Sequence, residues 1–164
     1  MLMHGYSIYF VFFAGVLDSN NSLERLLPRY RAAFSSPGFA ALARCTPLHM
    51  SMDDHEISDN WNSGMPLRGS AERELSRNAL AAFKVFQRAH GPGALGPDGH
   101  DGRFDCGGAA FISLNTRIHR QRSPIPRLLA DAQWTLLENW LAEQQARGNQ
   151  PKFILSGSVF APGL

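Results

Sequence analysis

The feature that most limits how this chain can fold is a helix-length apolar stripe followed by two strand-like runs that meet at a pair of glycines. Residues 70–90 repeat apolar side chains at helical spacing. Residues 103–106 and 109–115 are both rich in strand-forming side chains, and Gly107-Gly108 lies between them. Two strands joined by two glycines are typical of a β-hairpin. The sequence therefore predicts a helix and a hairpin in one domain.

The rest of the chain continues this alternation of helices and strands. Further helices are expected at residues 21–34, 39–44 and 131–147, and further strands at residues 48–52 and 152–159. Strands that alternate with helices are typical of an α/β layered fold. The 164 residues suit one domain, and the apolar fraction of 44% with 18% charged residues fits an ordinary globular protein.

The apolar run at residues 6–17 is open to two interpretations. Its Tyr, Ile, Phe and Val residues favour a buried strand, and the run is too short to span a bilayer. The alternative is the apolar part of a signal peptide, but no Lys or Arg precedes the run and no small-residue cleavage site follows it. The strand interpretation predicts no membrane contact and leaves the cytoplasm as the default location.

The charge pattern gives no reason to expect a nucleic-acid partner. The formal net charge is +2, and the arginines are scattered along the chain without a dense basic run. Nucleic-acid binding needs positive charge gathered on one surface. We therefore expect no DNA or RNA partner.

The densest polar cluster directly follows the strand expected at residues 48–52 and consists of Asp53, Asp54, His55 and Glu56. Several carboxylates beside a buried strand repel one another and lose hydration, unless a counter-charge offsets the cost. A bound cation would do so, and open α/β sheets bind their ligands at strand ends. The alternative is a solvated acidic loop that caps neighbouring helices and needs no metal.

Arg117 follows the second strand of the predicted hairpin, at the end of the sequence Asn115-Thr116-Arg117. A guanidinium at a strand end is well suited to contact a phosphate group through two hydrogen bonds. The alternative is a salt bridge between Arg117 and a nearby carboxylate. The sequence leaves both interpretations open.

Four blocks of sequence, taken in order, resemble the PhoD-like (alkaline phosphatase D-like) metallophosphatase family. They are residues 50–61 (MSMDDHEISDNW), 107–122 (GGAAFISLNTRIHRQR), 133–145 and 151–156 (PKFILS). The first resembles the acidic-histidine motif of the family, and the second resembles its strand that ends in Asp-Thr-Arg. The resemblance implies an α/β fold that is part of a metallo-dependent phosphatase-like α/β/β/α sandwich.

The resemblance also implies a chemistry, namely metal-dependent hydrolysis of a small-molecule phosphate mono- or diester. The cofactors would be two divalent metal ions of the Ca, Mn or Fe type. Asp54 corresponds to a metal ligand, and His55 to a catalytic residue that stabilises developing charge or protonates the leaving group. Asp53 and Glu56 correspond to carboxylates that orient these two residues, and Arg117 to a substrate-binding residue.

Departures from the family pattern predict that this activity is impaired. Tyr6 and Val11 stand where the Gly-Asp-Gln-Ile-Tyr-Ala-Asp motif of the family has its aspartates, and Asn115 stands where the family strand has Asp. We expect residues 1–164 to be a partial PhoD-like domain that lacks N- and C-terminal parts of the family domain. Unpaired sheet edges in such a domain predict marginal stability or self-association. The alternative to an impaired phosphoesterase is an inactive remnant, or a repurposed binding or scaffold protein without catalysis.

Overall fold

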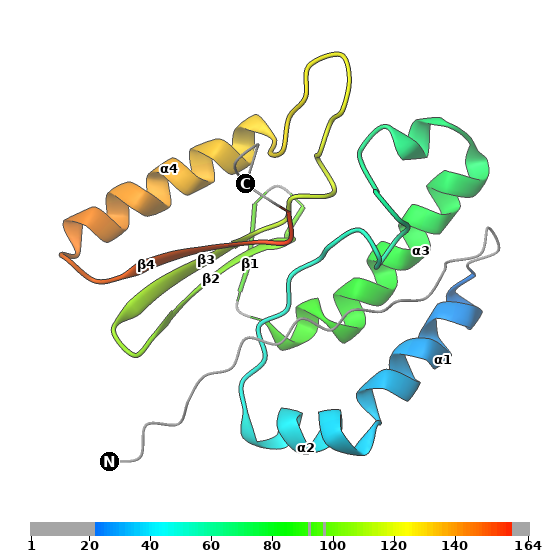
Figure 1. The fold of residues 1–164 in the computed structure, drawn as a ribbon, viewed down its shortest axis with the longest axis horizontal. Coiled ribbons are helices and arrows are strands. Elements are labelled where there is room, and N and C mark those ends of the chain that lie inside the picture. Colours follow the sequence, from blue (N-terminus) through cyan, green and yellow to red (C-terminus); the bar gives the residue numbers. More distant parts are fainter. Residues whose placement is uncertain (1–21, 92, 97, 159–164) are drawn as a thin grey trace.

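The computed structural model describes residues 22–158 except residues 92 and 97, and its elements form two groups (Figure 1). The first group holds three helices, α1 (Leu23–Phe34), α2 (Pro37–Cys45) and α3 (Ser70–Phe86). The second group is a four-stranded sheet of β1 (Ala94–Leu95), β2 (Asp101–Cys106), β3 (Ala109–Leu114) and β4 (Lys152–Ser156), with α4 (Asp131–Ala146) over one face. Short 3-10 helices lie at Met65–Leu67 and Arg88–His90. The predicted α/β class is confirmed.

Helices α1 and α3 pack against each other through the apolar stripe that the sequence predicts. Ala79, Ala82 and Phe83 of α3 are fully buried, and they share one hydrophobic cluster with Leu26 and Tyr30 of α1. The helix also has an acidic residue in its first turn and a basic residue in its last turn, as the helix dipole favours. The apolar periodicity and the charges at the two ends both favour a helix at α3.

The hairpin expected around the two glycines is present. Strands β2 and β3 pair antiparallel, with Cys106 opposite Ala109. Gly107 and Gly108 lie between them at φ values of 59° and 81°. A two-residue hairpin turn with both φ angles positive suits glycine, which has no Cβ to clash.

The sheet is mixed, because β3 and β4 pair parallel. Parallel neighbours require a crossover connection, and α4 supplies it. Ala110, Ile112 and Leu114 alternate along β3 with partly exposed residues, and they share a hydrophobic cluster with Leu137 and Trp140 of α4. The crossover helix therefore covers the apolar face of the hairpin strand.

The prediction of a strand at residues 48–52 is wrong. The segment has no regular secondary structure, although the Met52 side chain is fully buried in the cluster of α1 and α3. Its apolar residues are explained by packing onto helices and not by strand pairing. Conversely, β1 lies in a stretch that the sequence analysis assigns to no strand, and it pairs with the start of β2.

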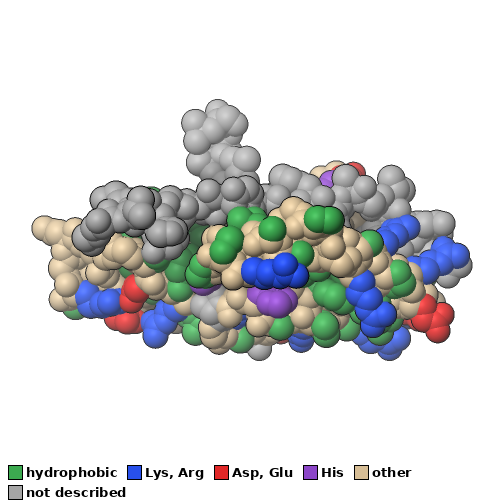
Figure 2. Space-filling model, turned by 90° about the horizontal axis from the view of Figure 1, so that it is seen from below, with side chains coloured by type: hydrophobic (Ala, Val, Ile, Leu, Met, Phe, Trp, Pro, Cys, Tyr) green, Lys and Arg blue, Asp and Glu red, His purple; other side chains and the backbone are tan. Residues whose placement is uncertain are grey.

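The predictions for residues 6–17, including the positions of Tyr6 and Val11, lie outside the described residues. Within the described part of the chain, no helix is both long and apolar enough to cross a membrane. On the face shown in Figure 2, Lys and Arg side chains are scattered among hydrophobic and acidic ones. This intermixing matches the scattered charges of the sequence.

Candidate functional site

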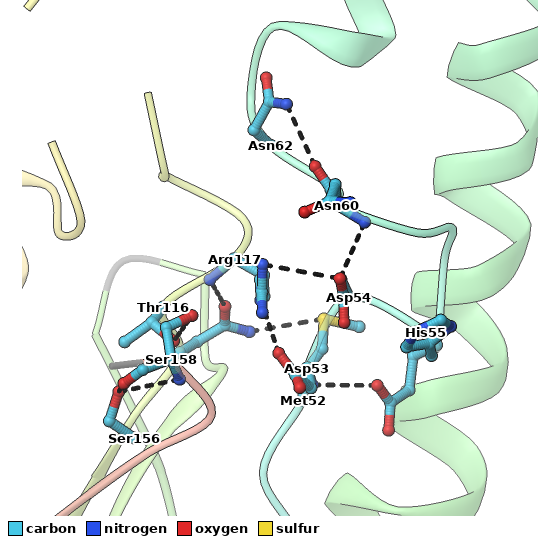
Figure 3. Close-up of polar contacts among 12 residues, drawn as sticks. Met52, Asp53, Asp54, His55, Asn60, Asn62, Thr116, Arg117, Ser156 and Ser158 are labelled. Atoms are coloured by element: carbon cyan, nitrogen blue, oxygen red, sulfur yellow. Dashed lines mark hydrogen bonds and ion pairs between the residues drawn. The ribbon is translucent and has the colours of Figure 1, made fainter. Parts of the chain in front are cut away.

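The parallel pairing of β3 and β4 brings the segments that follow them to one edge of the sheet. There the Thr116 hydroxyl donates a hydrogen bond to the Ser158 hydroxyl, over 3.1 Å. The acidic loop, which we define as residues 53–62, lies against this edge. A Cβ atom added to Gly157 would lie 3.1 Å from the Met52 carbonyl oxygen, so the chain after β4 touches the start of the loop. Strand ends and acidic loop thus form one site (Figure 3).

Asp54 is fixed by the turn that it begins. Its main-chain oxygen accepts hydrogen bonds from the N–H groups of Ile57 and Ser58, at 2.9 and 2.8 Å. Its side-chain Oδ2 accepts a third from the N–H of Asn60, at 2.8 Å. Asn60 has a φ of 56°, in the left-handed region that Asn tolerates better than most residues. Asp54 is only 6% exposed, so the loop holds a buried carboxylate in one position.

Arg117 lies between the sheet edge and the acidic loop. Its Nε donates to Asp53 Oδ1 over 2.5 Å, and its Nη1 lies 3.7 Å from Asp54 Oδ2. The Arg117 and Asp54 side chains are 10% and 9% exposed, whereas the Asp53 side chain is 29% exposed. Of the two interpretations left open for Arg117, the structure shows the salt bridge. Contact with phosphate stays a prediction.

Asn115 anchors the turn that carries Arg117. Its Oδ1 accepts hydrogen bonds from the N–H groups of Arg117 and Ile118, at 2.9 and 3.1 Å. The N–H of Asn115 donates to Asp101 Oδ1 over 2.7 Å, and Gln133 Nε2 donates to the same oxygen over 2.9 Å. Burial raises the pKa of Asp101. The Asn115 amide oxygen accepts both main-chain hydrogen bonds and so holds the turn in place.

Glu56 points away from Arg117 into the helical group. Its Oε2 accepts the N–H of Asp53 at 2.9 Å, and its Oε1 accepts Gln87 Nε2 at 3.1 Å. The same Gln87 nitrogen donates to the Tyr30 hydroxyl over 3.3 Å. Burial raises the pKa values of both Glu56 and Tyr30. Glu56 therefore holds the main chain at Asp53 in place from the core of α1 and α3.

His55 lies on the other side of Asp54 from Arg117 (Figure 3). His55 Nε2 is 3.8 Å from Asp59 Oδ1, and their side chains are 45% and 75% exposed. One possible ligand atom from each of Asp54, His55 and Asp59 lies within 4.8 Å of the others. The sequence analysis gives Asp59 no role. Its position four residues after His55, in the same polar stretch, is the signal that could have found it.

This donor set fits one divalent cation. Carboxylate oxygens and an imidazole nitrogen are common ligands of Mn and Fe ions, and carboxylates also bind Ca. Among the described residues, the buried Ser58 hydroxyl of the same loop has no hydrogen-bond partner. The Arg117 guanidinium near Asp54 Oδ2 offsets part of the negative charge, which weakens cation binding.

Three supporting residues of the site carry no local sequence signal. They are Gln87, Asp101 and Gln133, which contact Glu56, Asn115 or each other across separations of 14 to 32 residues. Each is a common polar residue inside or next to a predicted element. Only the tertiary fold brings them to the site.

Comparison with known proteins gives one match. A family model described as PhoD-like phosphatase matches residues 18–156 of the 164. No curated protein matches the chain, and no solved structure matches it. The matched span contains the acidic loop, the hairpin, α4 and β4. The chain therefore belongs to the PhoD-like phosphatase family.

Proposed function

We propose that this chain is a metal-dependent phosphoesterase of low activity whose acidic loop binds a divalent cation of the Ca, Mn or Fe type. The observation that carries the proposal is the convergence of Asp54, His55 and Asp59 within 4.8 Å. A bound cation would polarise a phosphoryl oxygen and lower the pKa of a bound water. The substrate would be a small-molecule phosphate mono- or diester.

The residues of the loop have different tasks in this proposal. Asp54 and Asp59 hold the cation, since carboxylates bind such ions directly. In this proposal His55 lies beside the cation without binding it. Its side chain is 45% exposed and therefore open to a substrate on the solvent side, where the ring stabilises developing charge or protonates the leaving group. Asp53 and Glu56 keep the loop in shape, Asp53 through Arg117 and Glu56 through the N–H of Asp53.

Low activity is part of the proposal for two reasons. The family chemistry implies two cations, and Asp54, His55 and Asp59 form the single candidate ligand group among the described residues. In addition, the Arg117 guanidinium already pairs with Asp53 and approaches Asp54. A cation must therefore bind beside an existing positive charge, which costs binding free energy.

A second candidate function is a binding or scaffold protein without catalysis. It is favoured by the hydrogen bonds that Asp53, Asp54 and Glu56 already receive from the protein itself. Buried carboxylates with such partners are stable without a metal. In this case the acidic loop is a structural element that joins the helices to the sheet.

Hydrolysis of p-nitrophenyl phosphate and bis(p-nitrophenyl) phosphate, with Mn²⁺, Ca²⁺ or Fe²⁺ and with EDTA, separates the two candidates. We expect slow metal-dependent turnover that His55→Ala abolishes. The matched control is His90→Ala, because His90 is also exposed but lies at the end of the helical group. Folded protein without turnover under every condition would favour the second candidate. Equal loss of turnover in both variants would contradict the catalytic role of His55.

A further inference from the structure

Three arginines lie on one short segment beside the acidic loop. We call residues 117–122 the basic turn; its arginines are Arg117, Arg120 and Arg122. Arg117 is committed to Asp53 and Asp54 by the contacts described above. A guanidinium that is buried and already paired is poorly placed to take up an incoming anion. Arg120 and Arg122 differ from Arg117, because neither forms an ion pair with a described carboxylate.

The main chain of Arg120 is fixed against Ser63, the residue that follows the acidic loop. Its carbonyl oxygen accepts two hydrogen bonds from Ser63, one from the N–H and one from the hydroxyl, both at 2.9 Å. Its N–H donates to the Arg117 carbonyl oxygen over 3.2 Å. Arg122 is tied to the same loop, because its Nη2 donates to Asn60 Oδ1 over 3.0 Å. Both arginines are therefore held at the rim of the candidate cation site.

Neither guanidinium forms an ion pair with a carboxylate within the described part of the chain. Arg120 is half-buried, and its side chain forms no hydrogen bond or ion pair with another described residue. The partner of Arg122 is a neutral amide oxygen. Burial, and then the positive charges of Arg117 and Arg122, lower the pKa of Arg120, and the nearby Asp54 and Asp53 carboxylates offset part of this shift. A half-buried cation among like charges gains free energy when an anion binds.

We propose that Arg120 and Arg122 form an anion-binding subsite that takes the phosphoryl group of the substrate, whereas Arg117 is a positioning residue for Asp53 and Asp54. Guanidinium groups present paired N–H donors that match phosphate oxygens. The neighbouring acidic loop supplies the place for the cation, so phosphate oxygens would lie between opposite charges on two loops that hydrogen bonds hold together. The phosphoryl identity of the anion rests on the proposed function. The anion subsite itself does not need a metal.

Inorganic phosphate is the probe, titrated calorimetrically into the EDTA-treated chain at low and constant ionic strength. We expect Arg120→Gln and Arg122→Gln each to weaken phosphate binding by roughly tenfold or more, as for loss of hydrogen bonds to a charged group. Arg77→Gln is the matched control, since Arg77 is an exposed arginine of α3 whose nearest carboxylate is 4.0 Å away. It should change the affinity by less than about twofold, because exposed charges are screened.

Two further variants keep the test decisive. Arg120→Lys keeps the charge but not the paired donors, so its affinity should lie between those of the native chain and Arg120→Gln. Arg122 is exposed, so Arg122→Gln carries the test if Arg120→Gln does not fold. The subsite is refuted by a native chain that binds no phosphate, by full affinity in Arg122→Gln, or by equal loss in Arg77→Gln.

Failure of the subsite and failure of the proposed function give different results. Phosphate binding without any metal-dependent hydrolysis supports the subsite and contradicts the proposed enzyme. Metal-dependent hydrolysis with an unchanged KM in Arg120→Gln and Arg122→Gln overturns the subsite alone.

Discussion

The helical group and the sheet group solve the same problem, burial of apolar surface, in different ways. In the sheet group, regular strand pairing satisfies the main chain, and the cluster under α4 is made of apolar side chains. In the helical group, the irregular acidic loop enters the core, where Met52, Ile57 and Trp61 pack against α1 and α3. Its main chain is satisfied by side chains such as Glu56 and Asp54. The candidate site therefore belongs to the less regular region.

A few contacts connect the two regions. Arg117 reaches Asp53 from the end of β3, and Asn115 Nδ2 lies 3.5 Å from the Met52 sulfur. Gly157, after β4, lies against the Met52 carbonyl. We expect these contacts to make the regions unfold together. Substitutions in either region, in the contacts between them, or at single titratable groups should lower stability by decreasing amounts.

The largest effect is expected from emptying either core. Trp140 is 3% exposed under the sheet and Phe83 is fully buried in the helical group. Truncation of either to Ala should lower the free energy of unfolding by about 3–5 kcal/mol, through lost burial and the cavity left behind. Urea unfolding should show one transition by fluorescence and by circular dichroism. Two separate transitions would contradict the coupling of the two regions.

The connection itself is tested by Arg117→Met. This change removes the guanidinium that pairs with Asp53 and Asp54. Removal of one partner from a fully buried ion pair lowers the free energy of unfolding by about 3–5 kcal/mol. We expect about 2–4 kcal/mol here, since solvent reaches the 29% exposed Asp53 side chain and weakens the pair. The double variant Arg117→Met with Asp53→Asn should recover part of the loss. No recovery in urea unfolding would argue against the pair as the connection.

Two buried carboxyl groups, one in each region, should respond to pH in the same direction. Burial raises the pKa of Glu56 in the helical group and of Asp101 in the sheet group. Between the unfolded and the folded pKa, the folded chain binds more protons, so the free energy of unfolding falls as pH rises through that interval. Glu56→Gln and Asp101→Asn should each flatten this slope in urea titrations. A slope unchanged in both variants would show that other groups set it.

The histidine beside β2 should respond in the opposite direction. Burial lowers the pKa of His100 from 6.5 to about 4. In that interval the unfolded chain binds the proton and the folded chain does not, so stability falls as pH is lowered through it. His100→Gln should remove this loss of stability in thermal unfolding at a series of pH values. If His100→Gln loses as much stability at low pH as the native chain, His100 is not the group responsible.

The smallest effect on stability is expected at the sheet edge. Within the described residues β4 pairs only with β3, and Phe153 and Ile154 are 46% and 43% exposed. Ile154→Lys should change the free energy of unfolding by less than about 0.5 kcal/mol, as for most surface changes. It should reduce concentration-dependent self-association in sedimentation velocity, since a charged edge opposes strand pairing. Equal association of both chains would place the contact elsewhere.

The sequence predicts regular elements well where a local pattern decides them. The hairpin follows from two glycines, and α3 from its apolar period. In α4 the helix is confirmed, but its large apolar residues Trp134 and Leu141 are 43% and 38% exposed. The buried stripe of α4 includes Gln133 and Gln144 instead. Polar residues in a buried stripe escape a pattern that counts only apolar ones.

Prediction of the site shows the same division. The acidic cluster at residues 53–56 is visible because its charges are adjacent in the sequence. The prediction of a strand at residues 48–52 is wrong because Met52 is buried by packing against helices and not by pairing with another strand. Partners such as Gln87 of Glu56 lie 31 residues away, so only the fold identifies them.

The central claim, that the acidic loop binds a divalent cation, is tested most directly by Mn²⁺ calorimetry. Asp59→Asn changes an exposed ligand and should leave the fold intact, and the matched control Asp105→Asn changes a carboxylate of β2 paired with Arg147. We expect Mn²⁺ binding that Asp59→Asn weakens by at least the roughly tenfold that loss of a partner outside the ligand shell costs, and that Asp105→Asn leaves unchanged. Absence of binding, or equal affinity in the native chain and Asp59→Asn, would contradict it.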